Sequence, residues 1–333
     1  MVYMKKNKLI LLLAAAIMVL LIGLICTMSV IRVLGQGGGN MLLFSFGGKA
    51  ELRNTIEIPV SEVNSLKLVY RSKNIKVYPS KDDAVTVKEY LYSNSPAAKA
   101  SVTRGNGKEV LIEGGQTHTF VLFGFFWGEG ERIEVYVPEK ALEAFWVETG
   151  SGNITSRSGR VEAKKSIQAK AGSGNIKWQD GAAEEISIQA GSGNLNVEGL
   201  KGNINLQTGS GNISGEALEG KLNVSAGSGN VTLKEVSGSG KVKAGSGNVK
   251  VEAVSVTGDI EIQTQSGNNS LEIPGDLNFY FQAETGSGNI HTDFEEQLSY
   301  NQKGNHGEGN VGDENALTIS MKAGSGNVRV RRR

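Results

Sequence analysis

The tripeptide Ser-Gly-Asn recurs nine times in the C-terminal two-thirds of this 333-residue chain, and no other feature constrains the fold as strongly. Successive asparagines are separated by 22, 19, 18, 18, 18, 20, 21 and 38 residues. A repeat of nearly fixed length close to twenty residues is typical of a solenoid, in which each repeat forms one coil. The interval of 38 residues suggests two coils merged by an insertion.

The hydrophobic pattern within one repeat indicates which kind of solenoid to expect. Apolar residues are spaced two apart, as in Leu195 and Val197 or Ile204 and Leu206, with polar residues such as Asn205 between them. This is the period of a β-strand and not of a helix. The sequence therefore predicts an all-β protein, a parallel β-solenoid (β-helix) with coils of about 18–22 residues and one face of every strand in a shared core.

The repeated tripeptide has the composition of a corner. The residue two positions before the tripeptide is always Thr or Ala, as at Thr149 and Ala171, which suits a narrow coil. The glycines are expected to adopt positive φ where the chain turns. Asparagines that recur at one position are expected to form a ladder along the stack. Turn chemistry accounts for the whole motif, so we predict no metal and no cofactor there. The predicted ladder consists of Asn74, Asn153, Asn175, Asn194, Asn212, Asn230, Asn248, Asn268, Asn289 and Asn327.

The first member of this ladder comes from a disguised repeat. The segment 66–77 aligns with 186–197, so that Asn74 occupies the asparagine position and Tyr70 that of Ala190. We therefore predict an irregular β section at 51–148 that caps the solenoid. The regular repeats follow at 149–333, with a loop or hairpin insertion near 300–316. At about 19 residues per coil, this length predicts about 15 coils.

The N-terminus carries a separate signal. Residues 9–31 contain no charged residue, a length sufficient to cross a bilayer as a helix. Three lysines precede this run and Arg32 follows it, which predicts a cytoplasmic N-terminus at residues 1–8 and an extracytoplasmic C-terminal domain on a single-pass membrane protein. The segment 32–50 is then a tether and apolar segment. A cleaved signal peptide is the alternative.

Two further segments depart from the repeat. The first is an aromatic run that, together with the apolar segment 41–46, either closes the first coil or forms a patch for the membrane or a membrane protein. Its candidate residues are Phe120, Phe123, Phe125, Phe126 and Trp127. The second is the C-terminal basic cluster, which either protects an exposed edge strand or contacts a polyanion such as a cell-wall polymer or phospholipid headgroup. Its residues are Arg329, Arg331, Arg332 and Arg333.

Charge and motif content exclude several functions. Without the four basic residues before position 35, the chain has 35 − 4 = 31 basic and 34 acidic residues, a net charge of −3, which gives no nucleic-acid footprint. The three histidines, His118, His291 and His306, are far apart, and no nucleophile motif is present. A polysaccharide-active β-helix enzyme is the enzymatic alternative. It would need an acidic cluster on one face, whereas the outward residues beside the corners are of mixed charge.

The N-terminal apolar helix, the Val135-Tyr-Val-Pro138 step and the tandem Ser-Gly-Asn repeats together resemble a bacterial putative-adhesin family of unknown function. That family includes the membrane protein of Lia-type envelope-stress operons. The resemblance covers roughly residues 50–333 and implies an extracytoplasmic β-solenoid without known enzymatic activity. We therefore expect a non-enzymatic, adhesin-like binding or scaffolding surface of the cell envelope, or an accessory protein that contacts a membrane sensor in envelope-stress signalling.

Overall fold

The computed structural model describes residues 41–42, 45–46, 49–116, 120–121, 124–125, 130–139, 142–157, 159–312 and 317–333. These residues belong to two compact units. One comprises Met1–Lys49 and Gln116–Gly130, and the other comprises Ala50–Gly115 and Glu131–Arg333. The predicted membrane helix at 9–31 lies outside the described residues. Among the residues described, no helix has the length and apolarity needed to cross a membrane.

In the first unit, the two apolar segments singled out in the sequence pair with each other. Strand β1 (Met41–Leu42) is parallel to β9 (Phe120–Val121), and β2 (Ser45–Phe46) is parallel to β10 (Gly124–Phe125). The side chains of these segments lie outside the described residues.

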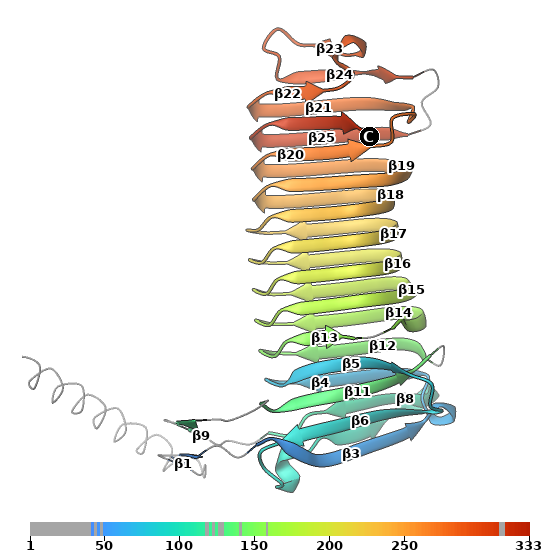
Figure 1. The fold of residues 1–333 in the computed structure, drawn as a ribbon, viewed down its shortest axis with the longest axis vertical. Helices are drawn as coiled ribbons and strands as arrows, with labels where there is room; N and C mark the ends of the chain where they lie inside the picture. The colour runs from blue at the N-terminus through green and yellow to red at the C-terminus, as the bar shows by residue number, and fades with distance from the viewer. Residues whose placement is uncertain are drawn as a thin grey trace, which may run out of the picture. The chain divides into compact units, whose positions relative to one another are not determined.

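The second unit is a stack of parallel strands (Figure 1). Each long strand bends around one coil and pairs in parallel with the strand of the next coil. The strands of the regular stack are β12 (Leu142–Thr149), β13 (Ile154–Ser156), β14 (Val161–Ala171), β15 (Ile176–Ala190), β16 (Leu195–Thr208), β17 (Ile213–Ala226), β18 (Val231–Ser246), β19 (Val249–Ser266), β20 (Asn269–Ile273), β21 (Phe279–Ser287), β22 (Ile290–Thr292), β25 (Thr318–Ser325) and β26 (Val328–Arg332).

The core follows the alternation seen in the sequence. Leu195, Val197, Leu200, Ile204 and Leu206 of one coil are all at most 1% exposed, while the polar residues between them face outward. Equivalent residues of neighbouring coils are in register, so the buried side chains form one continuous core. The prediction of an all-β fold with many parallel strands is confirmed. Helical structure in the described residues is limited to short 3₁₀ turns: η1 (Val60–Glu62), η2 (Pro96–Ala98), η3 (Asn106–Lys108) and η4 (Glu295–Gln297).

The corner glycines are required mainly because adjacent coils approach closely, and not because of positive φ. A Cβ atom on Gly193 would lie 1.9 Å from the carbonyl oxygen of Gly174, and one on Gly211 would lie 2.0 Å from that of Gly193. Among the motif glycines, φ is in the left-handed range only at Gly267, Gly288 and Gly326. The expectation that the glycines serve positive φ was therefore wrong for most corners. They leave room for the carbonyl group of the coil beneath.

The last repeat in the sequence is not the last coil in space. Strand β25 lies between β19 and β21, and β26 lies between β20 and β22 (Figure 1). After β22, the chain forms the end of the stack and then returns to insert its final 15 or so residues one coil back. The interval of 38 residues therefore does not represent two merged coils. Because β26 has a neighbour on both sides, its arginines do not protect an exposed edge, and that interpretation was wrong.

Antiparallel strands close the C-terminal end. Strand β24 (His306–Val311) is antiparallel to β21, and β23 (Ser299–Tyr300) is antiparallel to β24. An antiparallel strand interrupts the parallel stacking, so another coil of the same kind cannot be added on this face.

The N-terminal end is closed in the same way. Its strands are β3 (Glu51–Pro59), β4 (Ser65–Tyr70), β5 (Asn74–Ser80), β6 (Ala84–Leu91), β7 (Ser101–Arg104), β8 (Glu109–Glu113) and β11 (Arg132–Pro138). The pairs β3–β6, β6–β11 and β7–β8 are antiparallel, while β4 and β5 continue the parallel stack. The residues of the antiparallel strands at both ends do not form additional coils of the stack. The ladder therefore has ten corners, and the expected number of about 15 coils was wrong.

A buried carboxylate joins the elements of this N-terminal end. Glu89 is 0% exposed, and it accepts hydrogen bonds from Asn54 Nδ2 (2.7 Å), Tyr70 Oη (3.1 Å) and the backbone N–H of Ala100 (2.9 Å). Burial first, and then the charge of Glu89, raise the pKa of the Tyr70 hydroxyl well above its usual value, so this hydroxyl remains a donor. The network ties β3, β4 and β6 to the segment before β7, because each donor comes from a different element.

The close approach of the corner glycines predicts a large effect of a single methyl group. Gly193→Ala should lower the free energy of unfolding by about 3 kcal/mol, because the new Cβ would overlap a backbone oxygen that cannot move independently of its coil. Gly105→Ala is the control, since its Cβ would make only ordinary contacts of 3.5 Å or more. Chemical denaturation of the two variants measures both effects. Equal stability of Gly193→Ala and the parent chain would contradict the close-approach explanation.

Candidate binding surface

The ten corner asparagines lie in one column along the stack. In each case, the backbone N–H of an asparagine donates a hydrogen bond to Oδ1 of the asparagine in the preceding coil, at 2.8–2.9 Å. The order in this column is that of the coils in space, so Asn327 donates to Asn268 and Asn289 donates to Asn327. The side chains satisfy backbone donors that the parallel sheet leaves free at the corner.

The Thr or Ala two positions before each Ser-Gly-Asn tripeptide points into the core. Thr149, Ala171 and Thr208 are at most 2% exposed. Thr208 donates its hydroxyl hydrogen to the carbonyl of Gly193 at 2.8 Å and accepts from the N–H of Gly211 at 3.1 Å. The corner is therefore internally satisfied, and what remains for a ligand lies on the outward faces between the corners.

One outward face is hollowed along the stack. We call it the front face: the outward side chains of the strand segments that lead into the Ser-Gly-Asn corners. Among the described residues, three depressions lie on it, with volumes of about 500, 580 and 530 Å³. The first lies over β4, β8 and β12, the second extends from Gln168 to Lys241, and the third extends from Lys221 to Gln282 and Ser320. The second and third share Lys221 and Lys241.

The register of the strands aligns the residues of these depressions in a single column. We call it the central column, and each member is the Cα partner of the next. It consists of Trp146, Gln168, Ser187, Asn205, Asn223, Lys241, Glu261, Ser320 and Gln282.

The middle of the central column is uncharged. Asn223 Nδ2 donates to Asn205 Oδ1 at 3.0 Å, and Asn205 Nδ2 lies 3.3 Å from Ser187 Oγ. The adjacent outward positions, Gln189 and Gln207, also carry amides. The result is a surface of amide and hydroxyl groups on successive strands. Each amide offers both donors and an acceptor.

The N-terminal end of the central column is aromatic. The Trp146 ring is half-buried on the outer side of β12, and the Lys67 ammonium group lies 3.8 Å from its centroid. Leu111 and Lys67 line the same depression. This part of the front face is therefore the most apolar, and the amide surface begins one strand further along at Gln168.

Several charged residues of the front face form ion pairs between coils. Lys241 lies 2.7 Å from Glu261, Lys170 lies 3.5 Å from Glu148, and Lys322 lies 2.8 Å from Glu284. The hydrogen bond from Lys241 lowers the pKa of Glu261. Across the residues that the structure describes, no group of three His, Cys, Asp or Glu side chains is placed to hold a metal ion. The mixed column beside the corners thus carries ion pairs at its two ends, Lys170–Glu148 and Lys322–Glu284, and uncharged residues such as Gln189 and Gln207 between them.

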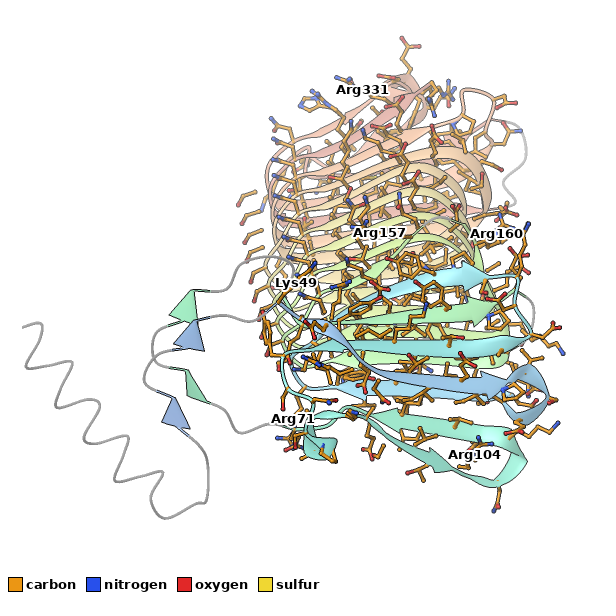
Figure 2. The ribbon with its side chains drawn as sticks, turned by 60° about the horizontal axis from the view of Figure 1, so that its bottom comes forward. Lys49, Arg71, Arg104, Arg157, Arg160 and Arg331 are labelled. Atoms are coloured by element: carbon orange, nitrogen blue, oxygen red, sulfur yellow. The ribbon has the colours of Figure 1, made fainter. Side chains whose placement is uncertain are left out.

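The predicted basic cluster is spread over the far end of the stack. Arg329 and Arg331 are exposed on the face that follows the corner, where Arg331 is the Cα partner of Glu272. Arg332 instead lies against the Phe294 ring, and Arg333 lies 3.5 Å from Glu272. Figure 2 shows Arg331 at the end of the stack away from Arg104. The arginines are therefore interspersed with acidic groups.

The predicted aromatic patch lies largely outside the described residues. Phe120 and Phe125 belong to the short strands β9 and β10, while Phe123, Phe126 and Trp127 are not described. The choice between a closing element and a membrane or partner patch stays a prediction.

A tyrosine cluster near the N-terminal end was not anticipated from the sequence. Tyr78 and Tyr136 stack with ring centroids 5.1 Å apart, Lys88 lies over the Tyr136 ring, and Arg132 lies over Tyr90. These residues come from β5, β6 and β11, which meet only because β11 inserts between the other two. Burial, followed by the charge of Glu134, raises the pKa of Tyr136 to about 12.

Taken together, these features define an elongated parallel β-solenoid with closed ends and a hollowed outward face. The chain belongs to the Toastrack DUF4097 family, whose sequence profile matches residues 63–331. No match was found among curated proteins.

This chain is similar to several solved structures. A putative adhesin from Parabacteroides distasonis is 13% identical, with a TM-score of 0.52 over 87% of this chain and 100% of that chain. A putative adhesin from Bacteroides fragilis is 13% identical, with a TM-score of 0.43 over 83% and 96% of the two chains. A third, from Parabacteroides merdae, is 11% identical, with a TM-score of 0.41 over 87% and 99%. These relatives are named as adhesins and not as enzymes.

The asparagine ladder predicts that its oxygens contribute to stability. Asn212→Ala removes the acceptor for the N–H of Asn230 and should lower the free energy of unfolding by about 1 kcal/mol. Asn212→Asp retains an oxygen at this position and should recover most of the loss. Asn196→Ala, at an exposed position on β16, is the control and should be nearly neutral. Urea denaturation measures all three, and an equal effect of the two alanine variants would contradict the ladder.

The tyrosine cluster predicts an alkaline loss of stability. The folded state raises the pKa of Tyr136 from 10.0 to about 12 and so favours the neutral phenol. Its contribution is complete below pH 10 and is lost as the pH rises toward 12. Tyr136→Phe should therefore weaken the dependence of the urea midpoint on pH in this range. A variant with the same slope as the parent chain would show that Tyr136 titrates normally.

Proposed function

We propose that this protein is a non-enzymatic, adhesin-like binding or scaffolding surface of the bacterial cell envelope, held at the membrane by its N-terminal segment. The front face is the binding surface. The observation that carries the proposal is the run of depressions along one face of the stack, where Lys170, Lys241 and Lys322 form ion pairs with glutamates of neighbouring coils. Such a surface offers many contacts to an extended ligand and no catalytic cluster.

The names of the structural relatives support the adhesin-like part of this proposal, as does the earlier resemblance. The membrane-anchored part rests on the uncharged run at 9–31 and the basic residues before it. With this orientation, the stack lies outside the cytoplasm, where its ligands are polymers or proteins of the envelope.

Cosedimentation with purified, protein-free cell walls tests the binding function. The full chain in a detergent without sugar headgroups should pellet with the walls in a saturable manner, because the front face provides the contacts. Two matched variants place the same charge on different faces of β16. Gln207→Arg places it on the front face, and Asn196→Arg places it on the face that follows the corner. Only the former should reduce pelleting. Absence of pelleting of the parent chain, or equal loss in both variants, would count against a front-face binding function.

The alternative function is that of an accessory to envelope-stress signalling. The observation that favours it is the pairing of β1 and β2 with β9 and β10. Strands β1 and β2 follow the predicted membrane helix in the sequence, so this paired unit is expected to lie near the membrane. In this case, the first unit would contact a membrane sensor. Photocrosslinking from position 42 in intact cells should then capture a membrane protein, and capture of lipid alone would argue against this role.

A further inference from the structure

We propose that the front face binds a linear, uncharged polysaccharide, with Trp146 stacking on one sugar ring and the amides of the central column hydrogen-bonding to the following sugars. The inference rests on the proposed binding function and specifies the chemical class of the ligand and the residues that recognise it.

The first argument is the shape of the surface. The central column crosses nine strands, from Trp146 on β12 to Gln282 on β21, in unbroken register. At about 4.8 Å per strand, eight intervals give a length of about 38 Å. The depressions follow one another along this line, and the second and third share Lys221 and Lys241. Such a surface suits an extended chain and not a compact small molecule.

The second argument is hydrogen-bonding chemistry. From Gln168 to Asn223, four successive positions of the central column are amides or a hydroxyl, and the neighbouring column has Gln189, Gln207 and Ser225. A sugar hydroxyl both donates and accepts, as do these side chains. The hydrogen bond from Asn223 Nδ2 to Asn205 Oδ1 orients both amides. It uses one donor and one acceptor, so further donor and acceptor positions remain for a ligand.

The third argument is charge. Lys221 and Lys241 in the depressions are balanced by Glu185, Asp259 and Glu261, and Lys241 is directly paired with Glu261. A polyanion would have to break the Lys241–Glu261 pair and would meet the acidic groups beside it. An uncharged chain meets no such barrier, so electrostatic complementarity favours a neutral ligand.

The fourth argument is the placement of the indole ring. Trp146 stands in the central column, next to Gln168, where a ligand lying along the amides would reach it. The indole ring has an electron-rich face, which attracts the polarised C–H groups on the face of a sugar ring. The Lys67 ammonium group already lies 3.8 Å from the ring centroid, as expected for a positive charge beside an electron-rich ring face. Lysine is flexible and can give way to a ligand.

Fluorescence titration tests the proposal on the full chain in detergent without sugar headgroups. The probes are chitohexaose and cellohexaose as uncharged chains and polyglutamate as an anionic chain. The chain has three tryptophans, of which Trp178 is fully buried. The hexaoses should change the emission in a saturable manner, and the change should disappear in Trp146→Phe. Polyglutamate should have little effect.

Calorimetric titration of matched variants then locates the site. Asn205→Ala/Asn223→Ala should weaken hexaose binding at least about tenfold, as expected for the loss of two or more hydrogen bonds. Asn196→Ala/Ser214→Ala is the control, because these residues are Cα partners on the same two strands but on the next face. The control should bind like the parent chain, and thermal unfolding of both variants checks that each is folded.

Three results would overturn the inference: no binding of either hexaose, equal weakening in both double variants, or tighter binding of polyglutamate. The cell-wall assay separates this failure from failure of the proposed function. Wall binding that persists in Asn205→Ala/Asn223→Ala would leave the envelope-binding function standing and rule out the amide site. Hexaose binding without wall binding would support the site and contradict the envelope function.

Discussion

The whole stack depends on the close contact between glycines of adjacent coils at the Ser-Gly-Asn corner. A Cβ at the glycine of the Ser-Gly-Asn motif would lie about 2 Å from a backbone oxygen of the neighbouring coil, so only glycine permits the observed separation. The asparagine that follows donates its N–H to the side chain of the preceding coil, which fixes the register at the same point. Separation and register at the corner then determine which outward residues become neighbours on the faces.

The front face is a consequence of this register. Asn205 and Asn223 are 18 residues apart and yet adjacent, so a surface of amides arises from single residues in successive coils. The insertion of β25 adds Ser320 between Glu261 and Gln282, and this changes the composition of the third depression. The functional surface thus combines segments that are distant in the chain, and its chemistry is set by stacking order as much as by sequence.

The sequence was sufficient for the local structure and for the core. The period of the motif indicated coils, and the alternation around Leu195 and Ile204 indicated which residues are buried, because both depend on near neighbours in the chain. Even Asn74 was recognisable from its flanking apolar residues. Amide positions such as Asn205 and Asn223 were also recognisable as outward, since they recur at one place in the repeat.

The order of the coils was beyond the reach of the same reasoning. The interval between Asn289 and Asn327 tells how many residues separate the two corners. No local feature of the sequence indicates that the coil of Asn327 inserts between those of Asn268 and Asn289. The positive φ expected of the glycines failed for a related reason, because their true constraint comes from another coil. The tyrosine cluster and the position of Trp146 beside Gln168 likewise depend on long-range pairing, which a single sequence does not reveal.

The most direct test of this account is the stacking order itself, probed by pairs of cysteines in a Cys26→Ser background. Gln263 and Lys322 are Cα partners on adjacent strands. Glu284 is the Cα partner of Lys322 on its other side, so it lies two strands away from Gln263. A disulfide needs Cα atoms no more than about 7 Å apart, which adjacent parallel strands satisfy and strands two positions apart, at about 10 Å, do not. The account predicts that Gln263→Cys/Lys322→Cys oxidises to a disulfide and Gln263→Cys/Glu284→Cys does not. The opposite outcome would show that the coils stack in sequence order and would contradict both the inserted C-terminal strand and the front face built on it.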